Sequence, residues 1–448
     1  MDSISPDKTG LSVIIVGAGI AGLAAATALA QKEHSVLVLE SKPALNEFGA
    51  SIGILSNGVR CLKAWGLQRE FEEVVTKNRY LEIRDKDGSS IGHIPHNKND
   101  AALIWYGDEI WNINRKDYQQ VLAKAAEANG AEIMFDADIE SVDVEKCIVR
   151  LTDGKQLPAD VIVGADGMKS VVRRSIPALS GVELVPLKEA AFRCTVPKEK
   201  MRGTPKIEWL LNSGDEMCWT APGRYVLAWP LPNNRPYDVV MCIKGRYSDV
   251  PAGRWGVKAD PEKARKEFQD FCPEVRELLS HVDGCMEWTL AELPSLSTCK
   301  SQNGRVVLIG DAFHAMIPHS ASGGNSSIED AACVAECLDW SSRNGRDIAE
   351  ATQVFEGLRK PRVERMQEAS REGAVFLGAY EDFIPIRDQA MAEQTKQYDI
   401  ELALPEDVRR AKPKAKPDMH ARFPTEPYLQ WLYSYDAIAV TKEHLAKV

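Results

Sequence analysis

The sequence predicts an α/β fold with three parts: a discontinuous domain around a parallel sheet, an inserted antiparallel β-sheet, and a C-terminal helical segment. A strand, a glycine-rich turn, a helix and a second strand follow one another over residues 11–40. Two further apolar strands, residues 161–164 and 305–309, are each followed within two residues by Asp. Runs rich in Val, Trp and Tyr, separated by Pro, Gly and Asn, occupy residues 191–246. The first two patterns are typical of βαβ units, and the third is typical of antiparallel strands.

The pieces of the parallel-sheet domain are separated along the chain. We assign to it residues 1–75, 112–190 and 291–345, and to the β-rich domain residues 76–111 and 191–290. The strands expected in the second part of the β-rich domain are residues 206–211, 217–220, 225–229 and 239–243. Residues 346–448 are expected to be helical, with the Lys360-Pro361 pair bending one long helix.

Composition and charge exclude several functions. The chain has 448 residues, with 55 Lys and Arg against 65 Asp and Glu, so its net charge is −10. No basic block stands out, and we expect neither nucleic acid nor an anionic membrane surface as a partner. The ten cysteines are scattered without a C-x-x-C pair. We therefore expect buried, reduced thiols, with no metal site and no disulfide framework.

Residues 11–30 form an uncharged stretch that is long enough to span a bilayer. Three glycines interrupt this stretch, and the residues before it lack the basic character of a signal peptide. A buried strand that turns into a buried helix explains the same apolarity. We therefore expect no membrane span and, by default, a cytoplasmic location.

The same stretch carries a G-x-G-x-x-G motif formed by Gly17, Gly19 and Gly22. The first glycine permits a tight turn, the second lets the backbone approach a pyrophosphate, and the third lets the helix pack on the strand. Glu40 ends the second strand, where a carboxylate accepts hydrogen bonds from ribose hydroxyls and disfavours a 2′-phosphate. The unit predicts dinucleotide binding rather than a simple packing turn, and on this motif alone FAD and NAD are equally good ligands.

Two later strands end in acid-containing turns. Asp166 follows the strand at 161–164, and Asp311 follows the strand at 305–309. At the carboxyl edge of a parallel sheet, Asp311 is placed to bind sugar hydroxyls, and the Gly323-Gly324 turn offers backbone N–H groups to a ring or a phosphate. Each acid has an alternative role as the N-cap of the helix that follows it.

Together these motifs resemble those of the single-component FAD-dependent aromatic hydroxylases, the salicylate hydroxylase-like family of flavoprotein monooxygenases. Residues 49–60, which include Gly53, resemble the family's segment beside the isoalloxazine ring. Residues 114–118 resemble the element whose arginine, here Arg115, contacts FAD, and residues 431–436 (W-L-Y-S-Y-D) resemble a C-terminal signature. The resemblance covers nearly the whole chain. It implies a discontinuous Rossmann-like FAD-binding domain that binds the cofactor through Gly17, Gly19, Gly22, Glu40, Gly53, Arg115, Asp166, Asp311, Gly323 and Gly324.

The resemblance also implies a reaction. NADPH or NADH reduces FAD, O2 then gives a flavin C4a-hydroperoxide, and an electron-rich aromatic or indolic, phenol-like substrate takes the distal hydroxyl group. Relatives usually lack a second Rossmann fold for the nicotinamide, and this sequence contains none. The Asp166-Gly167 segment is expected to serve both FAD and the nicotinamide.

Three residues are catalytic candidates. The family implies that Arg193, on the first strand of the inserted sheet, holds a phenolate or carboxylate, and that Tyr225 works with it on the same oxygen. An arginine paired with a carboxylate and a tyrosine that fills the core are the structural alternatives. His319 lies in the loop near the flavin ring and is a candidate substrate contact or base.

Other functions remain open at this point. They are a flavin oxidase or dehydrogenase without oxygen insertion, an NAD-dependent dehydrogenase, and a non-catalytic FAD-fold binding protein. Many relatives have P-x-x-G-Q-G-A in the flavin loop, where this chain has the sequence P-H-S-A-S-G-G at 318–324. This difference leaves the contacts of that loop and the substrate class undetermined. The identity of the substrate, the type of oxygenation, the choice of nicotinamide and the oligomeric state are not set by the sequence.

Overall fold

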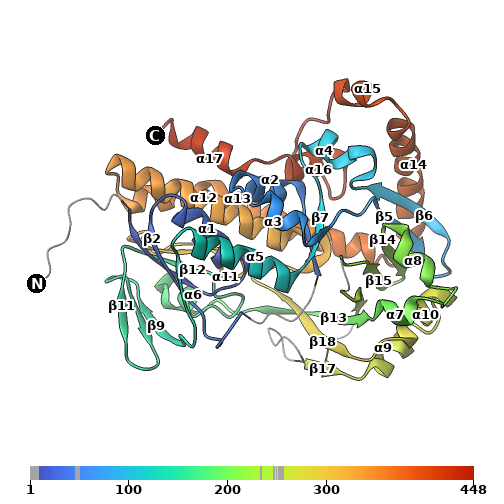
Figure 1. The fold of residues 1–448 in the computed structure, drawn as a ribbon, viewed down its shortest axis with the longest axis horizontal. Helices are drawn as coiled ribbons and strands as arrows, with labels where there is room; N and C mark the ends of the chain where they lie inside the picture. The colour runs from blue at the N-terminus through green and yellow to red at the C-terminus, as the bar shows by residue number, and fades with distance from the viewer. Residues whose placement is uncertain (1–9, 46–50, 233–234, 246–247, 249, 251–256) are drawn as a thin grey trace, which may run out of the picture.

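Two large sheets occupy opposite ends of the molecule (Figure 1). The computed structural model describes residues 10–45, 51–232, 235–245, 248, 250 and 257–448. The first two residues of the segment 49–60 therefore lie outside the described residues. The α/β fold class predicted from the sequence is confirmed.

The first sheet is parallel, with strand order β19-β12-β1-β2-β8. Its strands are β1 (Ser12–Val16), β2 (Ser35–Leu39), β8 (Glu132–Met134), β12 (Val161–Gly164) and β19 (Val306–Leu308). The three inner strands are runs of Val, Ile and Leu that are mostly buried, as expected for a parallel sheet covered on both faces.

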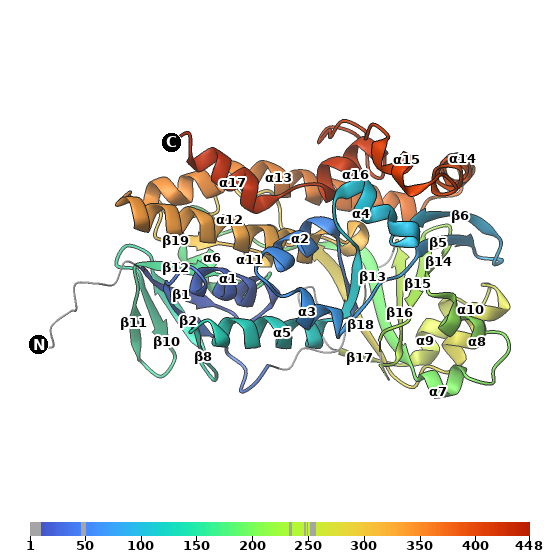
Figure 2. The ribbon, with the colours of Figure 1, turned by 45° about the horizontal axis from the view of Figure 1, so that its top comes forward.

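Helices cover this sheet in layers. Every residue of α1 (Ile20–Ala30) is buried, because the helix packs against both α5 (Arg115–Ala128) and α12 (Ser322–Asn344). Outside α12 lie α13 (Ile348–Leu377) and α17 (Ala437–Leu445), which form the upper layer in Figure 2. The uncharged stretch 11–30 is thus a buried strand followed by a buried helix.

The second sheet has eight strands in the order β17-β18-β13-β16-β15-β14-β5-β6, and only the β14–β5 pair is parallel. Its strands are β5 (Tyr80–Asp85), β6 (Ser90–Pro95), β13 (Val185–Val196), β14 (Glu216–Ala221), β15 (Arg224–Trp229), β16 (Tyr237–Lys244), β17 (Val257–Ala259) and β18 (Cys285–Glu292). One face packs on α8 (Glu208–Ser213), α9 (Pro261–Glu267) and α10 (Pro273–Ser280). The other, which we call the inner face, packs on Ile317, the end of α13 and α14 (Ile384–Leu402).

Smaller elements complete the chain. Two three-stranded sheets comprise β3 (Ser51–Ile54), β7 (Trp111–Asn114) and β4 (Val75–Thr76), and β9 (Ile139–Asp143), β10 (Ile148–Leu151) and β11 (Gln156–Pro158). The remaining α-helices are α2 (Ser56–Ala64), α3 (Gln68–Glu72), α4 (Ala101–Tyr106), α6 (Val171–Ser175), α7 (Lys198–Met201), α11 (Asp311–His314), α15 (Glu406–Ala411) and α16 (Glu426–Tyr433).

One predicted element is wrong. The expected strand at 206–211 is replaced by helix α8, because Ile207 and Leu210 are spaced three residues apart and both are buried in one core cluster. Gly214, with φ +67°, ends this helix in the left-handed conformation.

Further along, α13 continues through Pro361 as one element of 30 residues. In the described part of the chain, no helix is long and apolar enough to cross a membrane. The domain boundaries stay predictions.

Candidate active site

Four parallel strands end side by side at one edge of the first sheet. Their last residues are aligned in register across the sheet: Leu39, Val16, Gly164 and Leu308. Because these are carboxyl ends of parallel strands, the residues that follow them gather at the same edge: Gly17, Glu40, Asp166 and Asp311. Open α/β sheets bind their ligands at such an edge.

The three glycines of the first motif have different surroundings. Gly17 has φ +104°, and a Cβ there would lie 2.5 Å from the carbonyl oxygen of Ala165. A Cβ on Gly22 would lie 2.0 Å from the carbonyl oxygen of Gly17. A Cβ on Gly19, in contrast, would meet nothing within 4 Å. The N-terminus of α1 therefore opens onto free space, which is what a bound pyrophosphate requires.

Glu40 supports this glycine turn. Its Oε2 accepts a hydrogen bond from the Ala18 N–H at 3.0 Å, and its Oε1 accepts one from the Lys42 N–H at 2.9 Å. The residue is only half-buried, so its carboxylate stays accessible at the sheet edge. Contact with a ribose stays a prediction.

Asp166 is hydrogen-bonded to the start of the helix that follows it, α6. Its carboxylate accepts hydrogen bonds from the Ser170 hydroxyl at 2.5 Å and from the N–H groups of Val171 and Val172 at 2.7 and 3.1 Å. Burial raises the pKa of Asp166 above its ordinary value, although these donors act to lower it. The N-cap residue of α6 is Ser170, but Asp166 satisfies the first N–H groups of the same helix, so its acceptor oxygens are occupied much as the capping alternative requires.

Asp311 has the opposite environment. Its side chain is exposed and makes no hydrogen bond to any described residue. The capping alternative therefore does not account for this acid, and its carboxylate is available to a ligand at the sheet edge.

The two acids predict different effects of substitution. Asp311→Ala is expected to weaken FAD binding without changing the stability of the apoprotein, whereas Asp166→Ala is expected to cost about 1–2 kcal/mol of stability through the lost cap. FAD titration followed by quenching of flavin fluorescence, together with urea unfolding of both apoproteins, measures the two effects. An Asp311→Ala protein that purifies fully loaded with FAD would contradict this assignment.

The segment expected beside the flavin ring lies on β3. Gly53 is paired with Asn112 of β7, and Arg115 directly follows β7 as the first residue of α5. Asn325, near the start of α12, donates from Nδ2 to the Gly53 carbonyl at 3.1 Å and accepts at Oδ1 from the Leu55 N–H at 2.8 Å. These bonds fix the position of β3 relative to α12.

The glycine turn of α12 is brought to the same place. A Cβ on Gly324 would lie 2.5 Å from Cδ1 of Ile52 in β3, and a Cβ on Gly323 would lie 3.7 Å from Cγ of Met316. Gly324 therefore lies against β3 beside Gly53, whereas Gly323 contacts Met316, and contact of these glycines with the flavin stays a prediction. Sequence reasoning missed the role of Asn325, although an amide directly after two glycines was a visible signal.

Arg193 is paired with a buried acid. Its Nη2 donates to Oδ2 of Asp238 at 2.8 Å and to the Ser51 carbonyl of β3 at 2.6 Å. Asp238 is completely buried, and its Oδ2 also accepts the Ser51 N–H at 3.1 Å. The pair joins β13, β16 and β3. Arg193 is therefore paired with a carboxylate, which is the structural alternative stated above, and this pair lies beside the predicted flavin segment.

Tyr225 and His319 form a buried pair. The Tyr225 hydroxyl lies 2.7 Å from Nδ1 of His319 in a hydrogen bond. His319 Nε2 lies 3.0 Å from Oε1 of Glu189, but the geometry is not that of a hydrogen bond. Candidate metal-ligand atoms of Glu189, Cys242 and His319 lie within 4.8 Å of one another, the one such group found among the described residues. The sequence predicted Tyr225 and His319 separately, and the fold makes them partners.

The catalytic candidates share the inner face of the eight-stranded sheet. Tyr225 is paired with Cys242, and the next row of the face contains Arg193 and Leu227, both paired with Val240. Tyr225 and Cys242 are buried, whereas Arg193, Leu227 and Val240 are only half-buried. This row is therefore partly accessible among the described residues, and it combines two apolar side chains with the guanidinium of Arg193 as a hydrogen-bond donor.

Three acids on this face were not predicted: Glu189, Glu216 and Asp238. Asp238 is a single charged residue in an apolar run, which was an available signal, whereas Glu189 directly follows Lys188 and Glu216 directly follows Asp215. Burial raises the pKa of Glu216 to about 7, although Asn112 Nδ2, which donates to it at 3.5 Å, acts to lower the value.

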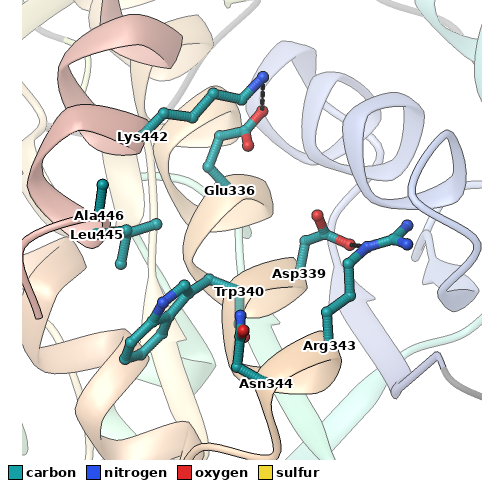
Figure 3. Close-up of a pocket in the computed structure, with 8 residues that line it drawn as sticks. All are labelled: Glu336, Asp339, Trp340, Arg343, Asn344, Lys442, Leu445 and Ala446. Carbon is teal, nitrogen blue, oxygen red and sulfur yellow. Dashed lines mark hydrogen bonds and ion pairs between the residues drawn. The ribbon is translucent and has the colours of Figure 1, made fainter.

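A separate surface pocket lies at the far end of α12 from the glycine turn (Figure 3). Its charged residues pair with each other, Glu336 with Lys442 at 3.8 Å and Asp339 with Arg343 at 2.6 Å. None of the predicted site residues lines it.

The fold is found in known proteins. Residues 10–369 match a family model described as an FAD binding domain. The chain is 26% identical over 439 residues to the FAD-dependent monooxygenase OpS4 of Beauveria bassiana, which covers 97% of each chain. It is 28% identical over 410 residues to a salicylate hydroxylase of Pseudomonas putida, covering 86% of this chain and 91% of the relative. The crystal structure of CtdE in complex with FAD and a substrate matches with a TM-score of 0.78 and 22% identity over 98% of both chains.

The described site fits the cofactor of these proteins. Gly19 opens the N-terminus of α1 to a phosphate, and the exposed Asp311 carboxylate lies at the same sheet edge. The family model covers most of the chain, and the relatives span nearly its full length. The chain therefore belongs to the FAD binding domain family and is an FAD-dependent monooxygenase of the aromatic hydroxylase type.

Proposed function

We propose that the protein hydroxylates a small aromatic or indolic, phenol-like substrate at the inner face of the eight-stranded sheet, with NADPH or NADH and O2 as co-substrates. The observation that carries this proposal is the gathering of Arg193, Tyr225 and His319 on that face, next to the β3 segment. A cytoplasmic location belongs to the proposal as well, and fractionation of cells that produce the protein tests it.

In this proposal FAD, once reduced by the nicotinamide, supplies the activated oxygen, and the protein binds and orients the ring. Gly17, Gly19, Gly22, Glu40 and Asp311 hold the dinucleotide, and Gly53, Arg115, Gly323 and Gly324 surround the flavin. The contribution of Asp166 is to order the turn through its cap. Buried side chains around the half-buried row exclude water from the reacting atoms.

The catalytic candidates have distinct tasks in this scheme. Nη1 of Arg193 makes no hydrogen bond to a described residue, so it can donate to an oxygen atom of the substrate. Burial, with Cys242 and Glu189 nearby, raises the pKa of Tyr225 well above its ordinary value, so its hydroxyl stays protonated. Tyr225 can then accept a proton from the substrate hydroxyl as its own passes to His319 Nδ1.

Loss of Arg193 is expected to separate cofactor binding from catalysis. Arg193→Ala should bind FAD as the wild type does and form product at least about a hundredfold more slowly, because a donor at the reacting centre is lost. Arg193→Gln, which keeps a donor toward Asp238, should show the same kinetic defect with less destabilisation. Arg224→Ala is the matched control, because Arg224 pairs with the more exposed Asp270 at 3.0 Å. Hydroxylation near the wild-type rate in both Arg193 variants would disprove the assignment.

The reaction itself is tested with isotopically labelled O2. The FAD-loaded protein is supplied with NADPH or NADH and a panel of phenols and indoles, and nicotinamide oxidation, O2 uptake and label in the product are measured together. We expect label in a hydroxylated product. Nicotinamide or substrate oxidation without label in any product would instead identify an oxidase or dehydrogenase.

A further inference from the structure

The charge of Arg193 is already neutralised by the protein. Its carboxylate partner Asp238 is completely buried and 2.8 Å away, and the same Nη2 atom also serves the Ser51 carbonyl. Only the Nη1 side of the guanidinium is left for a ligand. The site therefore offers a hydrogen-bond donor but no unpaired positive charge.

The other charged groups facing this region do not change that balance. Lys244 lies opposite Glu189 in the β13–β16 register and donates to the Ala374 carbonyl. Arg387 of α14 reaches the Thr220 hydroxyl at 3.0 Å and is paired with Asp388 at 2.7 Å. Arg387 is thus paired with an acid, Lys244 has Glu189 as its electrostatic neighbour, and Glu216 adds a further carboxyl group.

This balance discriminates between classes of ligand. A carboxylate that enters the half-buried row loses its hydration and gains no unpaired cation in return, while Asp238 repels it. A neutral carbonyl or phenol loses far less hydration and can accept the hydrogen bond from Arg193 Nη1.

We infer that the substrate presents a neutral oxygen acceptor to Arg193, such as an amide, lactam or phenol oxygen, and no free carboxylate, and that Asp238 determines this specificity. The inference rests on the proposed function, because it places the substrate on the same row of the sheet.

The test compares ligands that differ in this one group. Salicylamide and salicylate share the ring and the phenol, and each is titrated into the FAD-loaded protein while the flavin absorption spectrum is followed. Indole-2-carboxamide and indole-2-carboxylate form a second pair. In both pairs the amide is expected to bind at least about tenfold more tightly than the acid. Equal or tighter binding of either acid, or no binding of either amide, overturns the inference.

A substitution assigns the effect to Asp238. Asp238→Asn keeps the size of the side chain but removes its charge, so salicylate should gain at least about tenfold in affinity while salicylamide changes little. Asp270→Asn is the matched control, because it removes an acid from an arginine pair on the other side of the sheet. This variant should prefer salicylamide to salicylate by the same factor as the wild type. If Asp238→Asn does not fold, the two comparisons with the wild-type protein still decide whether the site prefers a neutral ligand to a carboxylate. Spectral binding needs no turnover, so a protein that prefers amides but incorporates no label would disprove the proposed hydroxylation alone.

Discussion

Gly19→Ala is expected to lower the affinity for FAD by about ten- to hundredfold, the loss of one charge-assisted hydrogen bond, while leaving the apoprotein as stable as the wild type. The added methyl group meets no protein atom within 4 Å, and Gly19 has φ −74°, which alanine adopts without strain. The methyl group would instead enter the space at the N-terminus of α1, where the pyrophosphate approaches the backbone.

Gly22→Ala provides the contrast for this prediction. A Cβ on Gly22 would lie 2.0 Å from the Gly17 carbonyl oxygen, so this variant should lose stability as well as FAD. Denaturant unfolding of the apoproteins and FAD titration separate the two effects. A Gly19→Ala protein with wild-type FAD affinity would mean that the space beside this helix is not the pyrophosphate site.

The second large effect concerns stability. Glu329→Ala is expected to cost about 3–5 kcal/mol, because it leaves the buried Arg362 without its carboxylate partner and leaves the buried Arg359 with Asp330 alone. Glu329 is completely buried and accepts hydrogen bonds from Arg359 at 2.6 Å and from Arg362 at 2.7 and 2.8 Å. Burial alone would raise the pKa of Glu329, but Arg362 and Arg359 hold it below its ordinary value, so the group is charged.

This cluster also reaches the cofactor segment. Glu329 accepts from Nδ2 of Asn57 at 2.6 Å, and Asn57 lies in α2, directly after β3. Urea unfolding should therefore show the loss of stability, and FAD titration should show a weaker cofactor site. Glu350→Ala is the control, since Glu350 pairs with Arg346 at 3.7 Å on the surface and should change stability by less than about 1 kcal/mol. A Glu329→Ala protein as stable as this control would contradict the account.

The cofactor edge could be predicted from the sequence because its signals are local. Gly17, Glu40 and Asp311 each follow an apolar strand directly, and parallel strands bring such positions together whatever the rest of the chain does. The same local signal could not show that Asp166 binds the N–H groups of its neighbouring helix while the Asp311 carboxylate stays exposed. Their difference depends on where Ser170 and the following N–H groups lie, which requires the folded backbone.

The catalytic face was less predictable because its contacts are distant in sequence. Arg193 meets Asp238 across 45 residues and Ser51 across 142, and Tyr225 meets His319 across 94. These pairs depend on the register of β13, β15 and β16 and on the docking of the loop before α12. The strand predicted at residues 206–211 was wrong for a related reason. A short apolar run is compatible with either a strand or a helix until its packing partner is known.

The central claim, that the chain is a flavin enzyme reduced by a nicotinamide, is tested most directly by the absorption spectrum of the purified protein. The spectrum is recorded without oxygen before and after addition of NADPH or NADH, with and without an aromatic ligand such as salicylamide. We predict a flavin band that bleaches with one of the two nicotinamides, faster with the ligand, and returns when air is admitted. A protein that shows no flavin band, even after incubation with FAD, would contradict the account.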